Sequence, residues 1–263
     1  MNTGIIIQAR QSSTRLPSKI MLPLGSNSVL GNVIMRAKKA CPLVIVATTE
    51  EKDDDLTVDE ALKYGAEVYR GSLHDVLLRY VGAVEKFSLD KVVRITSDCP
   101  CIDSDIIKNI LNHLDNGADY VSNVERRTFP HGLDTEAFTS QSLLKSHAEE
   151  NRPEIREHVT LHIRKSDNYK KIDYTNTSDH SDIRITLDTK EDYTVLQAVF
   201  DLLGDDFSWQ DIVALYKKHP WLYEINSGIY QKNVFLNIDE EKTEAIKLLK
   251  LHNMTQVAKL LNT

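Results

Sequence analysis

The sequence predicts an α/β fold in which helices flank a mostly parallel mixed sheet. Short apolar runs rich in β-branched residues alternate with helical patterns through the first half of the chain, as in βαβ units. The first run, GIIIQA at residues 4–9, is typical of a strand that is buried on both faces. A hydrophobic share of 41% is that of a globular protein rather than a disordered one.

Strand and helix patterns follow one another regularly up to about residue 114, with no internal repeat. The clearest helix is expected at residues 74–86, where Val76, Leu77, Tyr80 and Val84 recur on one face. In chain order we expect strand 4–9, helix 29–39, strand 43–48, helix 56–64, strand 67–70, helix 74–86, strand 91–96 and helix 105–114.

The alternation becomes less regular after Asp119. Ser208 stands immediately before a helical pattern, which predicts that it is the N-cap. We expect strands 118–123 and 132–138, helix 140–150, a helical stretch 156–165, extended segments 169–174 and 182–186, and helices 190–203 and 208–217.

A long amphipathic helix is expected near the C-terminus, at residues 240–261. Its apolar positions include Ile246, Leu249, Val257 and Leu260. Such a helix is more often a packing or dimer element than a catalytic one, so we expect a homodimer. The predicted organisation is an α/β domain over residues 1–235 and a C-terminal helical extension over residues 236–263.

The charge balance restricts the partners of this protein. A net charge of −7 argues against a broad electrostatic hold on nucleic acid or on an anionic membrane. The sequence has neither an apolar run of the roughly 20 residues that span a bilayer nor a signal-peptide pattern at its start. Cys41, Cys99 and Cys101 lack the spacing of zinc ligands, and we expect reduced thiols in a cytoplasmic protein.

The segment after the first strand carries a local excess of positive charge. Residues 8–19 include Arg10, Arg15 and Lys19 and no acidic residue. Open α/β sheets bind ligands beyond the carboxyl ends of their strands, and Arg and Lys suit phosphate oxygens. The dinucleotide pattern G-x-G-x-x-G and the Walker pattern are both absent from the sequence. On charge and position alone, the loop is either a phosphate cradle or a solvated basic surface.

The amino-acid sequence of the loop favours the phosphate cradle over the solvated surface. The segment QARQSSTRLPSK resembles the signature Q-A-R-x-x-S-T-R-L-P-G-K of the cytidylyltransferase family that includes spore coat polysaccharide biosynthesis proteins. It is more distantly similar to CMP-sialate and CMP-deoxy-manno-octulosonate synthetases. Ser18 replaces the glycine of that pattern, which restricts a positive-φ conformation. The similarity continues, in family order, through VAT at 46–48, GSLHDVLLRY at 71–80, RITSDCP at 94–100, DYVSN at 119–123, PHGLD at 130–134 and REHVT at 156–160.

The resemblance implies a nucleotide-diphospho-sugar transferase-like fold and a Mg²⁺-dependent transfer of CMP from CTP. The acceptor would be a sugar, a sugar acid or a small phosphorylated compound, and the product would feed a surface polysaccharide. An acceptor oxygen would attack the α-phosphorus, and pyrophosphate would leave. Arg10, Arg15, Lys19 and Asp98 are the expected catalytic residues. The expected nucleotide contacts are Gln8, Ala9, Arg10, Ser13, Thr14, Arg15, Lys19, Arg79, Thr96 and Asp98.

Two aspartates are implied as Mg²⁺ ligands. Asp98 follows the strand expected at 91–96, and Asp188 follows the extended segment at 182–186. Carboxylates at strand ends can hold Mg²⁺, which takes about six oxygen ligands with few of them from protein. From the residues alone a structural role is favoured for both, with Asp98 as an N-cap or turn residue and Asp188 as an N-cap of the helix near Lys190.

The acceptor side is implied to include His131, Glu157, His158 and Arg184. An Arg or a His could bind a carboxylate or a phosphate on the acceptor. The alternative is that the two histidines are ordinary, partly buried side chains, and that Glu157 forms a structural ion pair.

Two other functions are compatible with this fold class. A glycosyltransferase that consumes a nucleotide-sugar would carry a D-x-D metal motif. Asp103-Ser104-Asp105 matches that string, but it stands at an expected helix start, so we interpret it as capping. A non-catalytic nucleotide-binding protein would have no need of Asp98 and Asp188 as metal ligands.

Overall fold

The computed structural model describes residues 1–13, 15–229 and 238–261. The chain divides into two compact units, Met1–Ser227 and Gly228–Thr263, which we treat separately. The boundary predicted between residues 235 and 236 lies outside the described residues. In the described part of the chain, no helix is long and apolar enough to cross a membrane.

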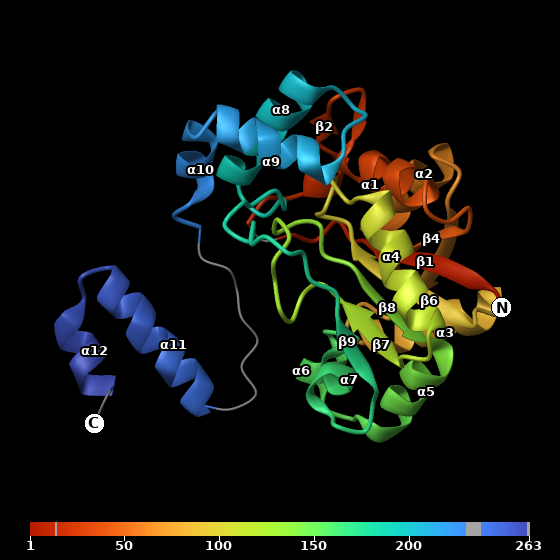
Figure 1. Ribbon diagram of the computed structural model, residues 1–263. Helices are drawn as coiled ribbons and strands as arrows, with labels where there is room; N and C mark the ends of the chain where they lie inside the picture. The colour runs from red at the N-terminus through yellow and green to blue at the C-terminus, as the bar shows by residue number, and fades with distance from the viewer. Residues whose placement is uncertain (14, 230–237, 262–263) are drawn as a thin grey trace. The chain divides into compact units, whose positions relative to one another are not determined.

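The first unit is built on a seven-stranded sheet in the order β5-β4-β1-β6-β8-β7-β9 (Figure 1). β8 runs antiparallel to both of its neighbours, and the other pairs are parallel. The predicted mostly parallel mixed sheet is therefore confirmed. The strands are β1 (Thr3–Gln8), β4 (Val44–Thr49), β5 (Glu67–Gly71), β6 (Lys91–Thr96), β7 (Tyr120–Ser122), β8 (Glu136–Thr139) and β9 (Lys171–Asp173), and β2 (Pro23–Leu24) pairs with β3 (Asn27–Ser28) in a separate hairpin.

Helices cover both faces of the sheet, so each face has its own apolar core. Ile5 and Ile7 of β1 pack with residues of α1 and α4, whereas Ile6 packs with α3 and α5 (Figure 1). This alternation follows from the strand period of two. The helices of the first unit are α1 (Val29–Lys38), α2 (Asp55–Lys63), α3 (Val76–Phe87), α4 (Ser104–Asp115), α5 (Ser140–Glu149), α6 (Pro153–Arg156), α7 (Leu161–Lys165), α8 (Lys190–Leu203), α9 (Trp209–Lys218) and α10 (Trp221–Asn226), with short 3₁₀ turns at Lys19–Met21 and Lys52–Asp54.

β1 lies at the point where the strand order reverses. It pairs in parallel with β4 on one side and with β6 on the other, so that Gln8 stands beside both Ala47 and Thr96. The connection from β1 leads to one side of the sheet, and β6 is placed on the other. Crevices at such switch points, outside the carboxyl ends of strands, are where α/β sheets bind ligands. The basic loop leaves β1 at this point.

A buried charge pair joins β6 to β8 beneath the carboxyl edge. Arg94 forms an ion pair with Glu136 and donates to Oε1 of Gln8 at 3.0 Å. The other carboxylate oxygen of Glu136 accepts from Tyr120 at 2.6 Å and from Thr160 at 2.5 Å. Burial alone would raise the pKa of Glu136, but the Arg94 charge and these donors outweigh it and lower the pKa.

The prediction of a single helical stretch at residues 156–165 is wrong for the middle of that range. α6 ends at Arg156 and α7 begins at Leu161. Val159 has a φ of 56°, an uncommon conformation for a β-branched residue, and it is buried in the core. The hydrogen bond from Thr160 to Glu136 and the burial of Val159 fix this turn. Tertiary contacts therefore interrupt the helix.

The segment 182–186 is extended, as expected, and it joins its neighbour through an isolated bridge between His131 and Arg184. One further expectation is corrected. In the second unit, the expected single helix at 240–261 is two helices, α11 (Ile238–Leu251) and α12 (Thr255–Leu261). Asn253 stands between them with a φ of 60°, and Met254 N donates to Leu249 O at 2.7 Å. Asparagine tolerates this left-handed C-terminal cap, which ends the first helix.

The Arg94–Glu136 pair yields the first testable prediction. Replacing Glu136 with Gln leaves the Arg94 guanidinium buried without its counter-charge, which should lower the free energy of unfolding by about 3 kcal/mol. Urea denaturation of the purified variant measures the loss. Lys108→Gln is the control, because its ion pair with Asp105 is exposed and should contribute little. Equal losses in both variants would contradict the assignment.

Candidate active site

The basic loop ends in a left-handed turn. Ser18 has φ 52° and ψ 27°, at the position where the family pattern has glycine. A side chain in this conformation costs roughly 1–2 kcal/mol, which explains why glycine suits the position. The turn leads directly into the 3₁₀ turn that begins at Lys19. The predicted need for a positive φ at this position is therefore met, with serine accepting the strain.

Lys19 lies at the centre of a cage of three oxygen atoms. Its Nζ donates to Asp98 Oδ2 at 3.0 Å, to Asp188 Oδ1 at 2.9 Å and to the carbonyl oxygen of Leu187 at 2.6 Å. These three acceptors match the three protons of the ammonium group. Burial alone would lower the pKa of Lys19, but the two carboxylates outweigh it and raise the pKa. The pKa of Asp98 is lowered, because the Lys19 charge and a hydrogen bond from Thr96 outweigh the effect of burial.

Backbone hydrogen bonds bring the two carboxylates together. Asp98 follows the end of β6, and its carbonyl oxygen accepts from Leu187 N at 2.9 Å and from Thr186 Oγ1 at 3.2 Å. Asp188 is therefore held beside Asp98 although 90 positions separate them in the sequence. Arg15 also reaches this point, with its NH2 group 3.0 Å from Asp188 Oδ1. The structure thus joins the basic loop to both predicted metal ligands.

Arg184 links the Asp188 carboxylate to His131. Arg184 contacts Asp188 Oδ2 at 3.3 Å through NH2 and His131 Nδ1 at 3.2 Å through NH1. Two backbone hydrogen bonds of 2.8 Å, between His131 and the residues on either side of Arg184, align the segments. Burial lowers the pKa of His131. A Cβ on Gly132 would lie 2.6 Å from the backbone of Ile185, so only glycine permits this approach.

Comparison with known proteins places this arrangement in a family. A family model described as cytidylyltransferase matches residues 4–243. The chain belongs to the cytidylyltransferase family. The family predicted from the loop is thereby confirmed, and this protein is an enzyme of that family.

Three similar proteins extend the comparison. A cytidylyltransferase from Leptospira borgpetersenii serovar Hardjo-bovis is 39% identical, with a TM-score of 0.83 over 88% of this chain and 100% of that one. The spore coat polysaccharide biosynthesis protein SpsF of Bacillus subtilis is 30% identical over 82% of this chain and 94% of its own length. A CMP:2-keto-3-deoxy-manno-octonic acid synthetase solved with CTP is 17% identical, with a TM-score of 0.58 over 77% of this chain and 99% of that one. The last likeness is one of fold, and it confirms the nucleotide-diphospho-sugar transferase-like architecture.

The other residues expected to contact the nucleotide belong to the basic loop, to α3 and to the end of β6. Arg10 is exposed, and Ala9 is buried, with its N–H donating to Ala47 O at 3.2 Å. Arg79 is only 2% exposed and donates to the carbonyl oxygens of Ser72 and Leu73, so it supports the segment before α3. Its contact with nucleotide stays a prediction, as do those of the remaining members. Gln8 accepts a hydrogen bond from Arg94, and Ser13 N donates to Gln11 O at 2.8 Å. Thr96 hydrogen-bonds Asp98 at the end of β6. Thr14 lies outside the described residues.

The two remaining residues expected on the acceptor side lie in a different part of the structure from His131 and Arg184. Glu157 and His158 lie in the turn between α6 and α7. Burial lowers the pKa of His158, and the charges that act on its pKa include those of Arg94 and Glu136. Arg184, by contrast, contacts both Asp188 and His131. The four predicted residues thus form two pairs in the described structure.

Two contributors to the site escaped the sequence analysis. The carbonyl oxygen of Leu187 is a backbone group, which no side-chain pattern reports. Asp192 is fully buried and binds Arg184 through both of its oxygens. Its only signal was the Thr189-x-x-Asp192 spacing of a capping box, which predicts a helix start and nothing more.

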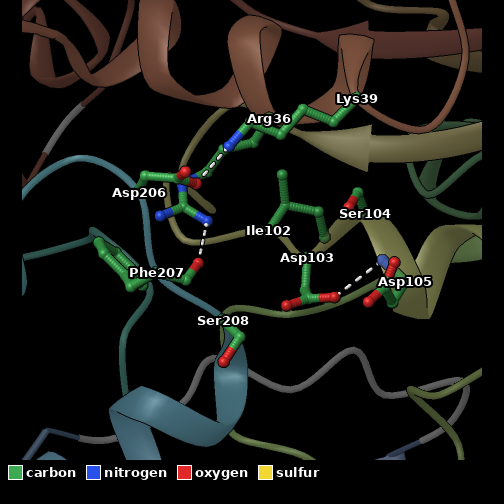
Figure 2. A pocket seen from close by; sticks show the side chains of 9 residues that line it. All are labelled: Arg36, Lys39, Ile102, Asp103, Ser104, Asp105, Asp206, Phe207 and Ser208. Atoms are coloured by element: carbon green, nitrogen blue, oxygen red, sulfur yellow. Dashed lines mark hydrogen bonds and ion pairs between the residues drawn. The ribbon is translucent and has the colours of Figure 1, made fainter.

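A cavity of about 180 Å³ lies apart from this site, between α1, the start of α4 and the segment before α9 (Figure 2). Arg36 crosses it, donates to Phe207 O at 3.0 Å and stacks on the Phe207 ring. Asp103 caps α4 by accepting from the N–H groups of Asp105 at 2.8 Å and Ile106 at 3.3 Å. The D-x-D string is therefore a helix cap, as predicted, which removes the sequence argument for a glycosyltransferase.

Proposed function

We propose that this enzyme transfers CMP from CTP to a sugar, a sugar acid or a small phosphorylated acceptor, with release of pyrophosphate, in the synthesis of a surface polysaccharide. The observation that carries the proposal is the meeting of Arg15 and Lys19 with Asp98 and Asp188 at the switch point of the sheet. The family supports CTP as the donor. The similarity to a spore coat polysaccharide biosynthesis protein supports the pathway class.

The residues of the cage fit a magnesium ion. Asp98 Oδ2, Asp188 Oδ1 and the Leu187 carbonyl oxygen already surround one positive charge, the Lys19 ammonium. All three are the hard oxygen ligands that Mg²⁺ prefers. Among the described residues, no group of three or more His, Cys, Asp or Glu side chains could hold a metal by itself. The two aspartates would therefore share the ion with phosphate oxygens, as is usual for Mg²⁺.

The basic residues account for binding and for charge stabilisation. Arg15 and Lys19 form ion pairs with the carboxylates, and their charges would also bind the triphosphate. With Arg10, they would stabilise the negative charge that grows on the leaving pyrophosphate. Such stabilisation is usually the largest contribution to the rate of these transfers. When bound, Mg²⁺ supplies further neutralisation of the phosphate oxygens.

His131 would orient the acceptor. Arg184 has only donors, so its contact assigns Nδ1 of His131 as the acceptor and leaves the proton on Nε2. Because burial lowers its pKa, the ring is neutral near pH 7. His131 would then donate a hydrogen bond from Nε2 to an acceptor oxygen and hold it beside Asp188. Contacts of Glu157 and His158 with the acceptor, a homodimer through the C-terminal unit and a cytoplasmic location stay predictions.

Nucleotide choice tests the proposed donor. Addition of CTP with Mg²⁺ should raise the melting temperature more than ATP, GTP or UTP does, because a ligand that binds the native state stabilises it by mass action. Differential scanning fluorimetry measures the shift. Pyrophosphate release in the presence of pooled sugar acceptors then measures turnover. A clear preference for GTP or UTP would assign the enzyme to a different nucleotide.

The loop residues give a second test. Lys19→Ala and Arg15→Ala should each reduce pyrophosphate release by about 10²–10³-fold, since each removes a charge that stabilises the leaving group. Lys63→Ala is the control, because Lys63 is an exposed lysine on α2 that pairs with Glu60. Unchanged turnover in both loop variants would show that the basic loop is only a surface feature.

The metal ligands give a third test. Activity should vanish with EDTA and return with Mg²⁺ or Mn²⁺, and Asp98→Asn should lose nearly all turnover. A helix cap tolerates this replacement, because Asn caps about as well as Asp, whereas a hard cation depends on carboxylate charge. Asp105→Asn, an exposed change in the first turn of α4, is the control. If Asp98→Asn matched the parent at limiting Mg²⁺, the metal site would lie elsewhere.

A further inference from the structure

Asp192 is a buried carboxylate at the start of α8, and it gathers five donors. Oδ1 accepts from Arg184 Nε at 2.8 Å and from Asn226 Nδ2 at 3.0 Å. Oδ2 accepts from Arg184 NH2 at 2.9 Å, from Asp188 N at 2.9 Å and from Thr189 N at 3.1 Å. The side chain is 0% exposed. A buried charge is costly unless it is paired and hydrogen-bonded, and this one is both.

Helix capping explains only part of this arrangement. α9 has the same type of capping box, in which Asp211 Oδ2 accepts from Ser208 N at 2.8 Å and from Ser208 Oγ at 2.6 Å. Both of those contacts lie within the box and are exposed. Asp192 makes the equivalent contact with Thr189 and, in addition, binds Arg184, Asp188 and Asn226. These additional partners are Arg184 and Asp188, which belong to the site, and Asn226, which also binds Arg184.

The contacts fix both ends of the segment that carries the site residues. Arg184 NH2 lies 2.9 Å from Asp192 Oδ2 and 3.3 Å from Asp188 Oδ2, so it bridges the two carboxylates. At the other end, the Asp188 N–H is bound to the same Asp192 oxygen. From α10, Asn226 Nδ2 donates to the carbonyl oxygen of Arg184 at 3.0 Å. The position of the Asp188 carboxylate therefore depends on Asp192 and Asn226, neither of which is in the oxygen cage.

We propose that Asp192, supported by Asn226, is a positioning residue that orients Asp188 for the divalent cation and Arg184 for the acceptor. This inference rests on the proposed function. Partners of this kind, one step removed from a metal, typically change metal affinity or activity by about 10–100-fold when they are replaced.

The test measures Mn²⁺ binding in the presence of CTP by electron paramagnetic resonance, with circular dichroism to confirm that each protein is folded at the assay temperature. Asp192→Asn keeps the shape of the side chain but removes its charge and one acceptor oxygen. Asn226→Ala removes two hydrogen bonds at a greater distance, and it carries the test if the first variant does not fold. Asp211→Asn is the matched control, since it alters the capping box of α9 alone.

Both Asp192→Asn and Asn226→Ala should weaken CTP-dependent Mn²⁺ binding by about tenfold or more, and Asp211→Asn should leave it unchanged. If the first two variants melt at lower temperature but bind Mn²⁺ as the parent does, Asp192 is only a helix cap and the proposal is overturned. Absence of CTP-dependent Mn²⁺ binding in the parent protein would instead overturn the proposed function, and the positioning role with it.

Discussion

The ammonium group of Lys19 joins three segments that lie far apart in the sequence. It binds the end of β6 through Asp98, and it binds the segment before α8 through Leu187 and Asp188. Without a positive charge between them, two carboxylates so close together would repel each other across a partly buried, low-dielectric space. The basic loop after β1 must therefore return to the sheet edge, and the left-handed turn at Ser18 is the local cost of that return.

The sheet topology makes this meeting possible, and periodicity was enough to predict most of it. β6 and α8 begin and end where the sequence predicted, because each has a clear period and clear boundaries. One error lies where tertiary contacts override local preference, because Val159 adopts a conformation that β-branched residues rarely take. The other is local: Asn253 is a left-handed cap that ends a helix whose apolar pattern continues beyond it.

The sequence could indicate those candidate site residues whose side chains follow the ends of predicted strands. The charges of Arg15 and Lys19 and the position of Asp98 after β6 each had a structural alternative, and the family pattern decided between the interpretations for these residues and for Asp188. The Leu187 carbonyl oxygen is a backbone group, which no side-chain pattern in a sequence can indicate. Asp192 carried the spacing of an ordinary helix cap, so its contacts with Arg184 and Asp188 became visible only in three dimensions. Residues that act through others are the ones that sequence reasoning misses.

The close approach at Gly132 has a consequence for how this enzyme tolerates sequence change. Any side chain at this position would press on the backbone of Ile185, three residues before Asp188. The displacement would pass along a short extended segment whose far end is fixed to Asp192. A single methyl group at position 132 would thus displace the Asp188 carboxylate, although glycine has no functional group. The packing of the site therefore restricts the sequence at a position that has no side chain of its own.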